Sequence, residues 1–496
     1  MSFFIGVDIG TTGVRAGVFG EDFHLLGTGQ GSSFIRKGPG GELYQDAEEI
    51  FIETAKAVKQ AIEKAGVDTR RIACLSFDGQ MAGVMGVDDK WRALTPYDSW
   101  LDTRCGEQVQ TMQERAREMV VKKSGNIPSY NHGPKILWWK EHRPEIYRNV
   151  HSFIQPGGYV AGRLCGLKGD RAFIDWTYLH FSGFADNRAL TWDDELTSLF
   201  GVEKGKLPHI VSPLTIVGGA QKDAAVLFGI PQGTPVAAGC GDTASCFLGA
   251  GAVEPGIAVD VAGTASVFAL TSNRFVSDLS GTVYSARSVV EDVWYSMSYV
   301  NGGGMNLEWF RETFAHGMRL EELNESAHRV PPGSGGLIFI PHLEGRAYPS
   351  NPKMRGQWQG FTRSHGLGHF YRSILEGIAF EYAVYRDRIS HLRGEELSFS
   401  IRGVGGGAAS GLWNQIKADV LKMRYCTINR EDIGILGQAL IAAASAGFIK
   451  DIVKTAGEIV TIEKSFEPQP DNAAVYEESV LKYRRMLGEK VLTDAS

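Results

Sequence analysis

The sequence predicts an α/β protein made of two similar halves that face each other across a cleft. One motif carries this prediction, because it occurs twice. In residues 3–19, two apolar runs flank Gly10-Thr11-Thr12-Gly13, as expected for two strands joined by a tight turn, and Asp8 ends the first strand. Residues 257–270 repeat the plan, with Asp260 placed 252 residues after Asp8. A repeat at half the chain length is too long for a solenoid and indicates two domains.

The elements after the first hairpin alternate as an α/β layer requires. A third strand is expected within residues 21–34. Residues 47–65 carry apolar side chains at helical spacing and stop before Gly66, a typical helix terminus. Residues 71–77 form the next strand. Strand, helix and strand in this order indicate an α/β fold.

Later elements continue this alternation around a less regular, aromatic-rich region. Residues 94–111 lead from a polar and aromatic stretch into a helix. Residues 131–142 and 178–192 form an insert whose aromatic side chains mostly belong to the core. We expect strands over 234–238, 296–300, 337–340 and 397–404, a helix that starts at 242, helices over 370–389, 412–423 and 434–447, and a charged surface helix over 475–487.

A hinge at Glu254-Pro255-Gly256 divides the chain into predicted domains of residues 1–251 and 252–496. A chain of 496 residues is long enough for two domains with a core each. Glycine makes up 61 of these residues, about 12% against a usual ~7%. Because the glycines follow no collagen-like period, they indicate tight turns and close approach of the backbone to a ligand.

Composition narrows the class of partner. A net charge of −6 without a long basic run argues against nucleic acid, and a small diffusible substrate fits better. The six dispersed cysteines include no C-x-x-C pair, so neither a zinc site nor a disulfide framework is indicated. Neither a basic leader with a cleavage site nor an apolar run of about 18 residues is present, which predicts a cytoplasmic protein without a membrane partner.

The hairpin turns and one later aspartate suggest phosphate chemistry. The turn after Asp8 offers backbone N–H groups and two hydroxyls to phosphate oxygens, and Asp8 can hold the cation that such a site needs. Asp242 follows a buried strand and Gly239-Cys240-Gly241, where a carboxylate can accept a proton from a substrate hydroxyl. Each aspartate also has a plain structural reading, in closing a turn or capping a helix.

Glycine-rich turns in the second half leave two nucleotide-binding chemistries open. The run from Gly403 to Ala408 satisfies the loose pattern G-x-G-x-x-A, so a dinucleotide-dependent oxidoreductase is the alternative from another class. That fingerprint usually opens its domain and is followed about 20 residues on by an acidic residue, which is missing here. No Walker motif occurs. Two hairpins, a late glycine turn and Asp242 point instead to phosphoryl transfer without a Walker lysine.

The chain resembles the FGGY family of carbohydrate kinases along nearly its whole length. Asp8-Ile9-Gly10-Thr11-Thr12 and Gly263-Thr264-Ala265-Ser266 look like the two phosphate motifs of that family, and Gly405-Gly406-Gly407 with Leu412 and Asn414 its adenosine motif. Residues 356–376 are similar to its C-terminal signature, and Lys135-Ile136 with Trp138 to the other. This resemblance implies two domains of the actin/hexokinase-like (ribonuclease H-like) fold with a central cleft.

The resemblance also implies an enzyme, an ATP-dependent carbohydrate kinase that uses Mg²⁺. Asp242 is then the catalytic base, and Asp8 and Asp242 hold the metal. Nucleotide-binding residues are expected at Gly10, Thr11, Thr12, Arg15, Gly263, Thr264, Gly303, Gly406, Gly407, Ala408 and Asn414. The sugar is expected to contact Gln80, Met81, Ala82, Trp100, Asp102, Arg104, Asp242 and Thr243.

Two motifs bear on which compound accepts the phosphoryl group. Gly79-Gln80-Met81-Ala82-Gly83 resembles the xylulokinase motif Gly-Gln-Met-His-Gly, and Trp100 to Cys105 resembles that subfamily's Trp-Asn-Asp-Gly-Arg-Cys. Ala82 replaces a sugar-contacting His, and Thr243 stands where Asn follows the base. D-Xylulose is therefore the first expectation, with gluconate, ribulose, fuculose and an erythritol-type polyol open. A sugar sensor that has lost catalysis is discouraged by Asp8 and Asp242, and a homodimer is possible.

Overall fold

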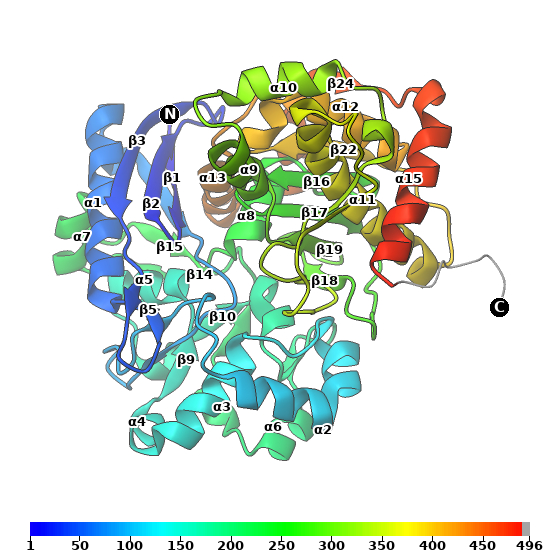
Figure 1. The fold of residues 1–496 in the computed structure, drawn as a ribbon. Coiled ribbons are helices and arrows are strands. Elements are labelled where there is room, and N and C mark those ends of the chain that lie inside the picture. The colour runs from blue at the N-terminus through cyan, green and yellow to red at the C-terminus, as the bar shows by residue number, and fades with distance from the viewer. Residues whose placement is uncertain (489–496) are drawn as a thin grey trace.

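The computed structural model describes residues 1–488 and has two lobes, each built on one sheet (Figure 1). The strand order is β14-β15-β6-β1-β2-β3 in the N-terminal sheet and β18-β19-β17-β16-β22-β23-β24 in the C-terminal sheet. In both sheets, the first strand of the hairpin pairs antiparallel with the second and parallel with a later strand. This shared pairing confirms the predicted α/β fold with two similar halves.

Both halves of the sequence mix strands with helices. The first half contains β1 (Phe3–Ile9), β2 (Gly13–Phe19), β3 (Leu25–Ser32), β4 (Arg36–Lys37), β5 (Leu43–Gln45), α1 (Ala47–Ala65), β6 (Ile72–Phe77), β7 (Met85–Val87), β8 (Tyr97–Asp98), α2 (Gly106–Ser124), α3 (His132–His142), α4 (Pro144–Asn149), β9 (Ser152–Ile154), α5 (Pro156–Cys165), β10 (Phe173–Asp175), β11 (Ala185–Asp186), β12 (Thr191–Trp192), α6 (Asp194–Phe200), β13 (His209–Val211), β14 (Ile216–Gly219), α7 (Lys222–Phe228), β15 (Pro235–Ala237) and α8 (Asp242–Gly249). The second half contains β16 (Ile257–Ala262), β17 (Ser266–Ser272), β18 (Tyr284–Arg287), β19 (Trp294–Val300), α9 (Gly304–Phe314), α10 (Leu320–His328), β20 (Ile338–Ile340), β21 (Gln357–Gln359), α11 (Leu367–Arg393), β22 (Ser400–Val404), α12 (Gly411–Leu421), β23 (Tyr425–Ile428), α13 (Ile433–Ser445), α14 (Ile452–Glu458), β24 (Ile462–Phe466) and α15 (Ala473–Met486).

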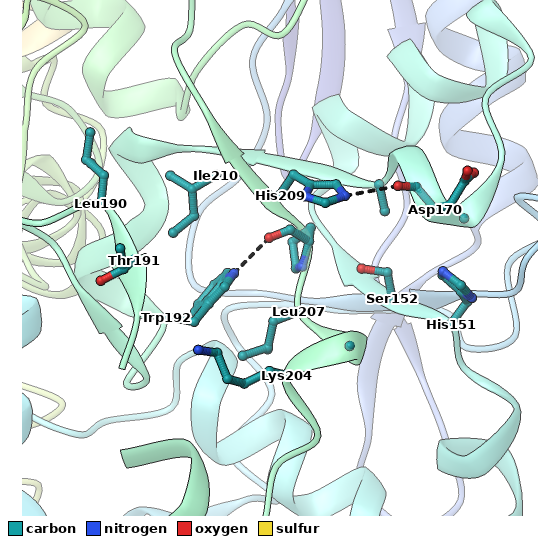
Figure 2. A pocket seen from close by; sticks show the side chains of 14 residues that line it. His151, Ser152, Asp170, Leu190, Thr191, Trp192, Lys204, Leu207, His209 and Ile210 are labelled. Carbon is teal, nitrogen blue, oxygen red and sulfur yellow. Dashed lines mark hydrogen bonds between the residues drawn. The ribbon is translucent and has the colours of Figure 1, made fainter. Parts of the chain in front are cut away.

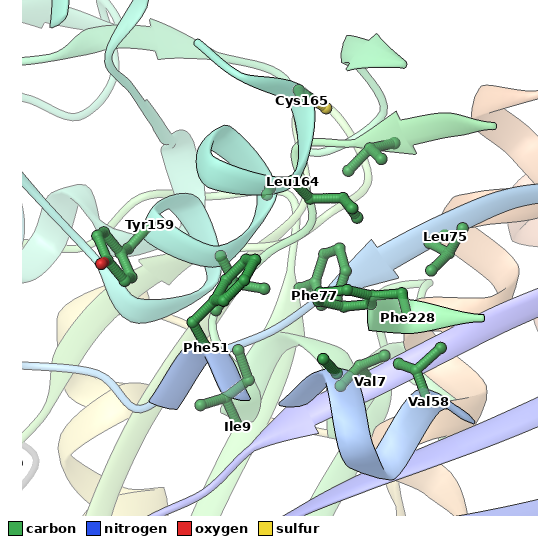
Figure 3. Close-up of a cluster of buried hydrophobic side chains, with 14 of the residues drawn as sticks. Val7, Ile9, Phe51, Val58, Leu75, Phe77, Tyr159, Leu164, Cys165 and Phe228 are labelled. Carbon is green, nitrogen blue, oxygen red and sulfur yellow. The ribbon is translucent and has the colours of Figure 1, made fainter. Parts of the chain in front are cut away.

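Helix α1 shows how local sequence sets one of these elements. Its N-cap Asp46 accepts a hydrogen bond from the Glu49 N–H, and Gly66 ends it in the left-handed conformation at φ 62°. Its apolar side chains, with Phe51 and Val58, share one hydrophobic core with residues of β1 and β6 (Figure 3). The predicted helix over residues 47–65 is confirmed.

Helix α13 belongs to the second half of the sequence but packs against the N-terminal sheet and α8 (Figure 1). Glycines permit this approach. A Cβ on Gly6 of β1 would lie 1.9 Å from the Ile435 carbonyl oxygen, and one on Gly437 would lie 2.1 Å from the Ser245 carbonyl oxygen. Helices α8 and α13 therefore lie between the two sheets with their backbones in contact. The domain boundary at 251/252 remains a prediction.

The second hairpin differs from the first in the face that its aspartate occupies. Asp8 lies two residues before its turn glycine, whereas Asp260 lies three residues before Gly263. Because strand side chains alternate between faces, this shift of one residue turns Asp260 toward α11 and α12. There it is fully buried, pairs with Lys417, and accepts a hydrogen bond of 2.6 Å from Tyr382. The two hairpins therefore share their strand pairing but not the position of the aspartate side chain.

The C-terminal helix α15 is a surface helix, as predicted, with one buried face. Tyr476 and Tyr483 are buried against α11. Their hydroxyls donate to Glu376 (3.1 Å) and Glu381 (2.5 Å) of that helix. The aromatic positions are spaced by seven residues, which places them on one helix face.

No helix in the described part of the chain combines the length and the apolar content that a membrane span requires.

Replacing Gly437 by alanine should destabilise the protein. The added methyl group would overlap the backbone of α8, and overpacking of this kind typically costs about 1 to 3 kcal/mol. Urea denaturation measures the loss. The matched control is Gly457→Ala, since a Cβ there meets no atom within 4 Å and alanine favours a helix. An equal loss of stability in both variants would contradict the role given to the contact between α8 and α13.

Candidate active site

A cavity of about 560 Å³ lies between the lobes and receives side chains from both. The N-terminal lobe contributes five of the residues predicted to bind sugar or to catalyse. Of the predicted nucleotide-binding residues, Thr11 lines it as well. The C-terminal lobe contributes a largely aromatic wall. The predicted residues at the cavity are Met81, Ala82, Trp100, Asp242, Thr243 and Thr11, and the opposite wall includes Tyr284, Arg287, Tyr295, Met297, Tyr299 and Tyr348.

Asp242 is the first residue of α8, directly after the turn that ends β15. Its N–H donates to the Gly79 carbonyl (3.1 Å), and its Oδ1 accepts from the Thr243 N–H (2.6 Å) and hydroxyl (3.1 Å). Oδ2 makes no hydrogen bond within residues 1–488. The carboxyl is therefore held through one oxygen, while the other is available to a ligand in the cavity.

Asp8, Asp78 and Asp242 lie within electrostatic reach of one another. Burial, together with the charge of Asp8, raises the pKa of Asp242 to about 7. Burial also raises the pKa of Asp8, whereas the neighbouring Asp78 and Arg15 lower it. The pKa of Asp78 stands well above its usual range because of burial and the charges of Asp8 and Asp242. None of the three makes an ion pair with a basic side chain of residues 1–488.

Asp78 is a site residue that sequence reasoning missed. It follows β6, which runs parallel to β1, so its carboxyl lies at the same sheet edge as Asp8. Its Oδ1 accepts from the Ile9 N–H at 3.2 Å, while Oδ2 is buried without a hydrogen-bond partner in the described chain. The position of an aspartate at the end of the strand next to β1 is the signal that could have found it.

The donor set fits a divalent cation that is shared with a phosphate ligand. Asp8 and Asp242 present carboxylate oxygens, the ligands that Mg²⁺ prefers, and a cation would offset their mutual repulsion. Within residues 1–488, no three His, Cys, Asp or Glu side chains are arranged to hold a metal ion by themselves. This fits Mg²⁺, which is usually held by one or two carboxylates together with substrate phosphates.

Gln80 lies behind the cavity wall and braces the first hairpin turn. Its Nε2 donates to the Gly10 carbonyl (3.2 Å) and to Gln45 Oε1 (2.6 Å). Its Oε1 accepts from the Thr11 hydroxyl (3.0 Å), which in turn accepts from the Trp100 indole N–H (3.0 Å). These bonds fix the turn that is predicted to meet phosphate. Gln45 is a second residue that sequence reasoning missed.

Asp102 and Arg104, both predicted to contact sugar, do not line the cavity either. Arg104 Nε lies 3.1 Å from Asp102 Oδ2, its Nη2 pairs with Asp98, and its guanidinium stacks over Trp138 at 4.0 Å. Lys135, a residue of the second signature, donates to the Asp102 carbonyl at 2.5 Å. This network supports the segment that carries Trp100, Leu101 and Thr103 into the cavity. A direct contact with sugar remains a prediction for both residues.

A second cavity of about 670 Å³ lies at the late glycine turn and also reaches the first hairpin. Four predicted nucleotide-binding residues line it: Arg15, Gly406, Ala408 and Asn414. Asn414 Nδ2 donates to the Ala408 carbonyl at 2.7 Å, which ties the turn to α12. Gly407 faces the interior instead, because a Cβ there would lie 2.6 Å from the Trp413 ring.

The turn of the second hairpin is braced by the start of α9. The Gly304 N–H donates to the Gly263 carbonyl (2.8 Å), and the Met305 N–H donates to the Thr264 carbonyl (3.1 Å). Gly303 allows this approach, since a Cβ there would lie 2.2 Å from Ser266 Oγ. Gly10, Thr12, Gly263, Thr264 and Gly303 line neither cavity, so their contact with nucleotide remains a prediction.

A third cavity, of about 430 Å³, lies within the N-terminal lobe and shares no lining residue with the other two (Figure 2). His209 Nε2 approaches the Asp170 carbonyl at 3.0 Å, and the Trp192 indole donates to the Pro208 carbonyl at 2.8 Å. No predicted site residue lies in this cavity, so the candidate active site is the pair of cavities between and beside the hairpins.

A two-lobed α/β fold with a buried carboxyl in the cleft and a glycine turn beside it is the arrangement expected of a phosphotransferase. The same fold is found among solved structures. A xylulose kinase from Lactobacillus acidophilus superimposes with a TM-score of 0.91 at 24% identity, over 98% of this chain and 99% of that one. A Plasmodium falciparum glycerol kinase solved with ADP gives 0.89 at 18% identity, over 99% of each chain. At these identities the likeness shows the fold.

The chain belongs to the FGGY family of carbohydrate kinases. The sequence model of that family's N-terminal domain matches residues 3–249, and the model of its C-terminal domain matches residues 258–446. Relatives include a xylulose kinase from Lactococcus lactis, 27% identical over 96% of this chain and 95% of the relative. A gluconokinase from Bacillus subtilis is also 27% identical, over 96% of this chain and 93% of the relative. The protein is an ATP-dependent carbohydrate kinase.

The oxidoreductase alternative finds no support among these relatives. The glycine pattern that suggested it begins inside β22, where Gly403 allows Tyr425 to pack closely, rather than at the first strand of a domain. A dinucleotide fingerprint places its glycines in the turn after the opening strand. The run from Gly403 to Ala408 is therefore not a dinucleotide fingerprint.

Two buried histidines should make the protein less stable in mild acid. His180 lines the cavity between the lobes and stacks on Tyr284, and His132 lies beside Tyr178. Burial lowers the pKa of each imidazole from 6.5 to about 3. At pH 5 the unfolded chain binds these protons and the folded chain does not, so each histidine should cost about 2 kcal/mol of stability relative to neutral pH.

Thermal denaturation at pH 7 and pH 5 measures this loss in the wild type and in His132→Gln. The variant should lose less stability on acidification than the wild type. His316→Gln removes an exposed imidazole and should behave like the wild type. A variant at His132 with the full wild-type loss would contradict the assignment.

Proposed function

We propose that the protein transfers the terminal phosphoryl group of ATP to a hydroxyl of a small sugar, with Asp242 as the general base. The observation that carries this proposal is the Asp242 carboxyl, held through Oδ1 in the cavity between the lobes while Oδ2 is free. Family membership supports the same chemistry. A terminal hydroxyl bound beside Oδ2 would lie in position to react.

In the reaction, Asp242 accepts the hydroxyl proton while the hydroxyl oxygen attacks the γ-phosphorus. The bond from that phosphorus to the bridging oxygen breaks, and ADP leaves with the bonding electrons. Phosphoryl transfer needs mainly positioning and charge stabilisation from the protein. The first hairpin turn, rigid through its bonds to Gln80, supplies backbone N–H groups for the phosphates. The late glycine turn with Asn414 accommodates the nucleoside.

Mg²⁺ would be held by Asp8 and Asp242 together with the phosphates of ATP. When bound, the ion neutralises charge on the phosphates. The protein's own part is to hold two carboxyls together without a basic ion-pair partner, so that a cation is attracted to this edge of the sheet. Closure of the lobes about residues 252–256 would exclude water that otherwise hydrolyses ATP.

D-Xylulose is the first acceptor to test. The resemblance of residues 79–83 and 100–105 to xylulokinase motifs favours it, and xylulose kinases are among the relatives. Gluconate follows, since gluconokinases are related at the same identity. Ala82, in the left-handed region at φ 64°, and Thr243 stand where the xylulokinase motifs have His and Asn, so the hydroxyl pattern that the site accepts differs.

A coupled assay of ADP formation over ketoses, polyols and sugar acids tests the proposal. We expect ADP formation that depends on both an acceptor and Mg²⁺. ATP hydrolysis that no acceptor stimulates would contradict a kinase function. Identification of the phosphorylated product by mass spectrometry would then establish which compound is the substrate.

Asp242→Asn should lower kcat by about 10² to 10⁴-fold, because the amide cannot accept the hydroxyl proton. ADP binding, measured by calorimetry, should persist, since the nucleotide cavity does not include this residue. Asp223→Asn changes an exposed carboxyl in the first turn of α7 and serves as the matched control. Near-normal turnover in Asp242→Asn would remove Asp242 as the base.

A further inference from the structure

Gln438 is a fully buried amide in the middle of helix α13. The other buried residues of this helix are isoleucine, leucine, alanine and glycine. A buried amide without hydrogen-bond partners lowers stability, so a glutamine in such a helix needs partners from other elements. Those partners belong to the N-terminal lobe, although Gln438 itself lies in the second half of the sequence.

The amide makes hydrogen bonds to three different segments. Ser76 Oγ, in β6, donates to Gln438 Oε1 at 2.5 Å. Gln438 Nε2 donates to Ser245 Oγ of α8 at 2.9 Å and to Cys240 Sγ, in the turn before α8, at 3.1 Å. Both N–H donors and the carbonyl oxygen therefore have partners, and the amide joins the strand, the turn and the helix.

Two of these three partners flank Asp242. Cys240 precedes it by two residues, and Ser245 follows it by three, in the first turn of α8. The Ser245 hydroxyl also donates to the Gly434 carbonyl at 2.7 Å, which ties α8 to the first turn of α13. Gln438 therefore holds the segment that carries Asp242 on both sides of that residue.

The turn before Asp242 also lies directly against the end of β6. Gly239 has a φ of 74°, and a Cβ there would lie 1.9 Å from the Phe77 carbonyl oxygen and 3.2 Å from Gln438 Oε1. Asp78 follows β6 directly, and its carboxyl lies within electrostatic reach of Asp242. Because like charges repel, a link between β6 and the turn opposes the movement of these two carboxyls away from each other.

We propose that Gln438 is a positioning residue for Asp242: its amide joins residues 239–241 and the start of α8 to β6 and so keeps the base in place. This role rests on the proposed function of Asp242 as the base. A reacting group displaced by about 1 Å can lose about 10²-fold in rate, so a support of this kind acts on kcat. Ile433, at the start of the same helix, lines the second cavity, so α13 contacts both ends of the site.

A purely structural role for Gln438 is the competing explanation. The amide would then only satisfy three neighbours, and the Gly241 N–H, which donates to Thr177 Oγ1 at 2.9 Å, would suffice to place Asp242. Loss of the amide would lower stability and would act on turnover independently of Asp242. A positioning role predicts a loss of turnover that depends on Asp242, because the misplacement of a base matters only while the base is present.

A double-mutant cycle with Asp242→Asn separates the two roles. Acceptor-dependent ADP formation is measured with Mg-ATP and the ketose, polyol or sugar acid that the wild type phosphorylates fastest, starting with D-xylulose and D-gluconate. Gln438→Met removes the amide and keeps the length of the side chain. It should lower kcat by about 10 to 100-fold and leave KM for ATP and for the acceptor unchanged within about 3-fold. In the Asp242→Asn background, the same change should lower kcat by less than about 3-fold.

Two further variants guard against an effect of misfolding. Ser245→Ala removes one acceptor of the amide and should cause a smaller loss of kcat that also depends on Asp242. If Gln438→Met does not fold, Ser245→Ala takes its place in the cycle. Ser445→Ala, at the end of the same helix, removes a buried hydroxyl without a hydrogen-bond partner in residues 1–488 and should turn over like the wild type. Thermal denaturation and calorimetric ADP binding establish that each variant is folded.

The positioning role is overturned if Gln438→Met and Ser245→Ala keep the kcat of the wild type. It is also overturned if either change lowers kcat by the same factor with and without the Asp242 carboxyl. If Asp242→Asn alone turns over nearly normally, or if the wild type phosphorylates no acceptor, the proposed function fails first, and the positioning role fails with it.

Discussion

Three carboxyl groups, from Asp8, Asp78 and Asp242, are held together at one edge of the N-terminal sheet without a basic ion-pair partner in the described chain. Their repulsion is opposed by the backbone that carries them. Asp8 and Asp78 end neighbouring parallel strands, and Asp242 begins α8, which packs against α13 through glycine contacts. Rigid backbone is what keeps like charges together, because flexible segments would move them apart.

The same constraint explains why the site is arranged for a charged ligand rather than for stability. Buried carboxyl groups that repel one another lower the stability of a fold. A bound cation with its phosphate ligands offsets that repulsion. Ala82 adds a second cost, since its φ of 64° is a conformation that side chains with a Cβ rarely adopt. Asp242 and Ala82 both line the cavity, which is consistent with ligand binding as the cause of both features.

Local patterns in the sequence predict much of the fold. The helical spacing and terminal glycine of α1 and the two hairpins are short-range features, and the structure has them where they are predicted. The face that Asp260 occupies depends on a shift of one residue before the turn, which the similarity of the two hairpins does not reveal. Asp78 and Gln45 were missed because their roles arise from pairing between strands and from contacts over tens of residues, which no local pattern encodes.

The same distinction applies to the acceptor. The motifs that resemble those of xylulokinases lie within residues 79–105. Gln80, Asp102 and Arg104 of this segment lie behind the cavity wall, where they hold the wall in position. The opposite wall comes from β18 and β19, nearly two hundred residues later, where no motif was recognised. A ligand in the cavity would contact both walls at once, so motifs that describe one lobe alone leave the choice of acceptor open.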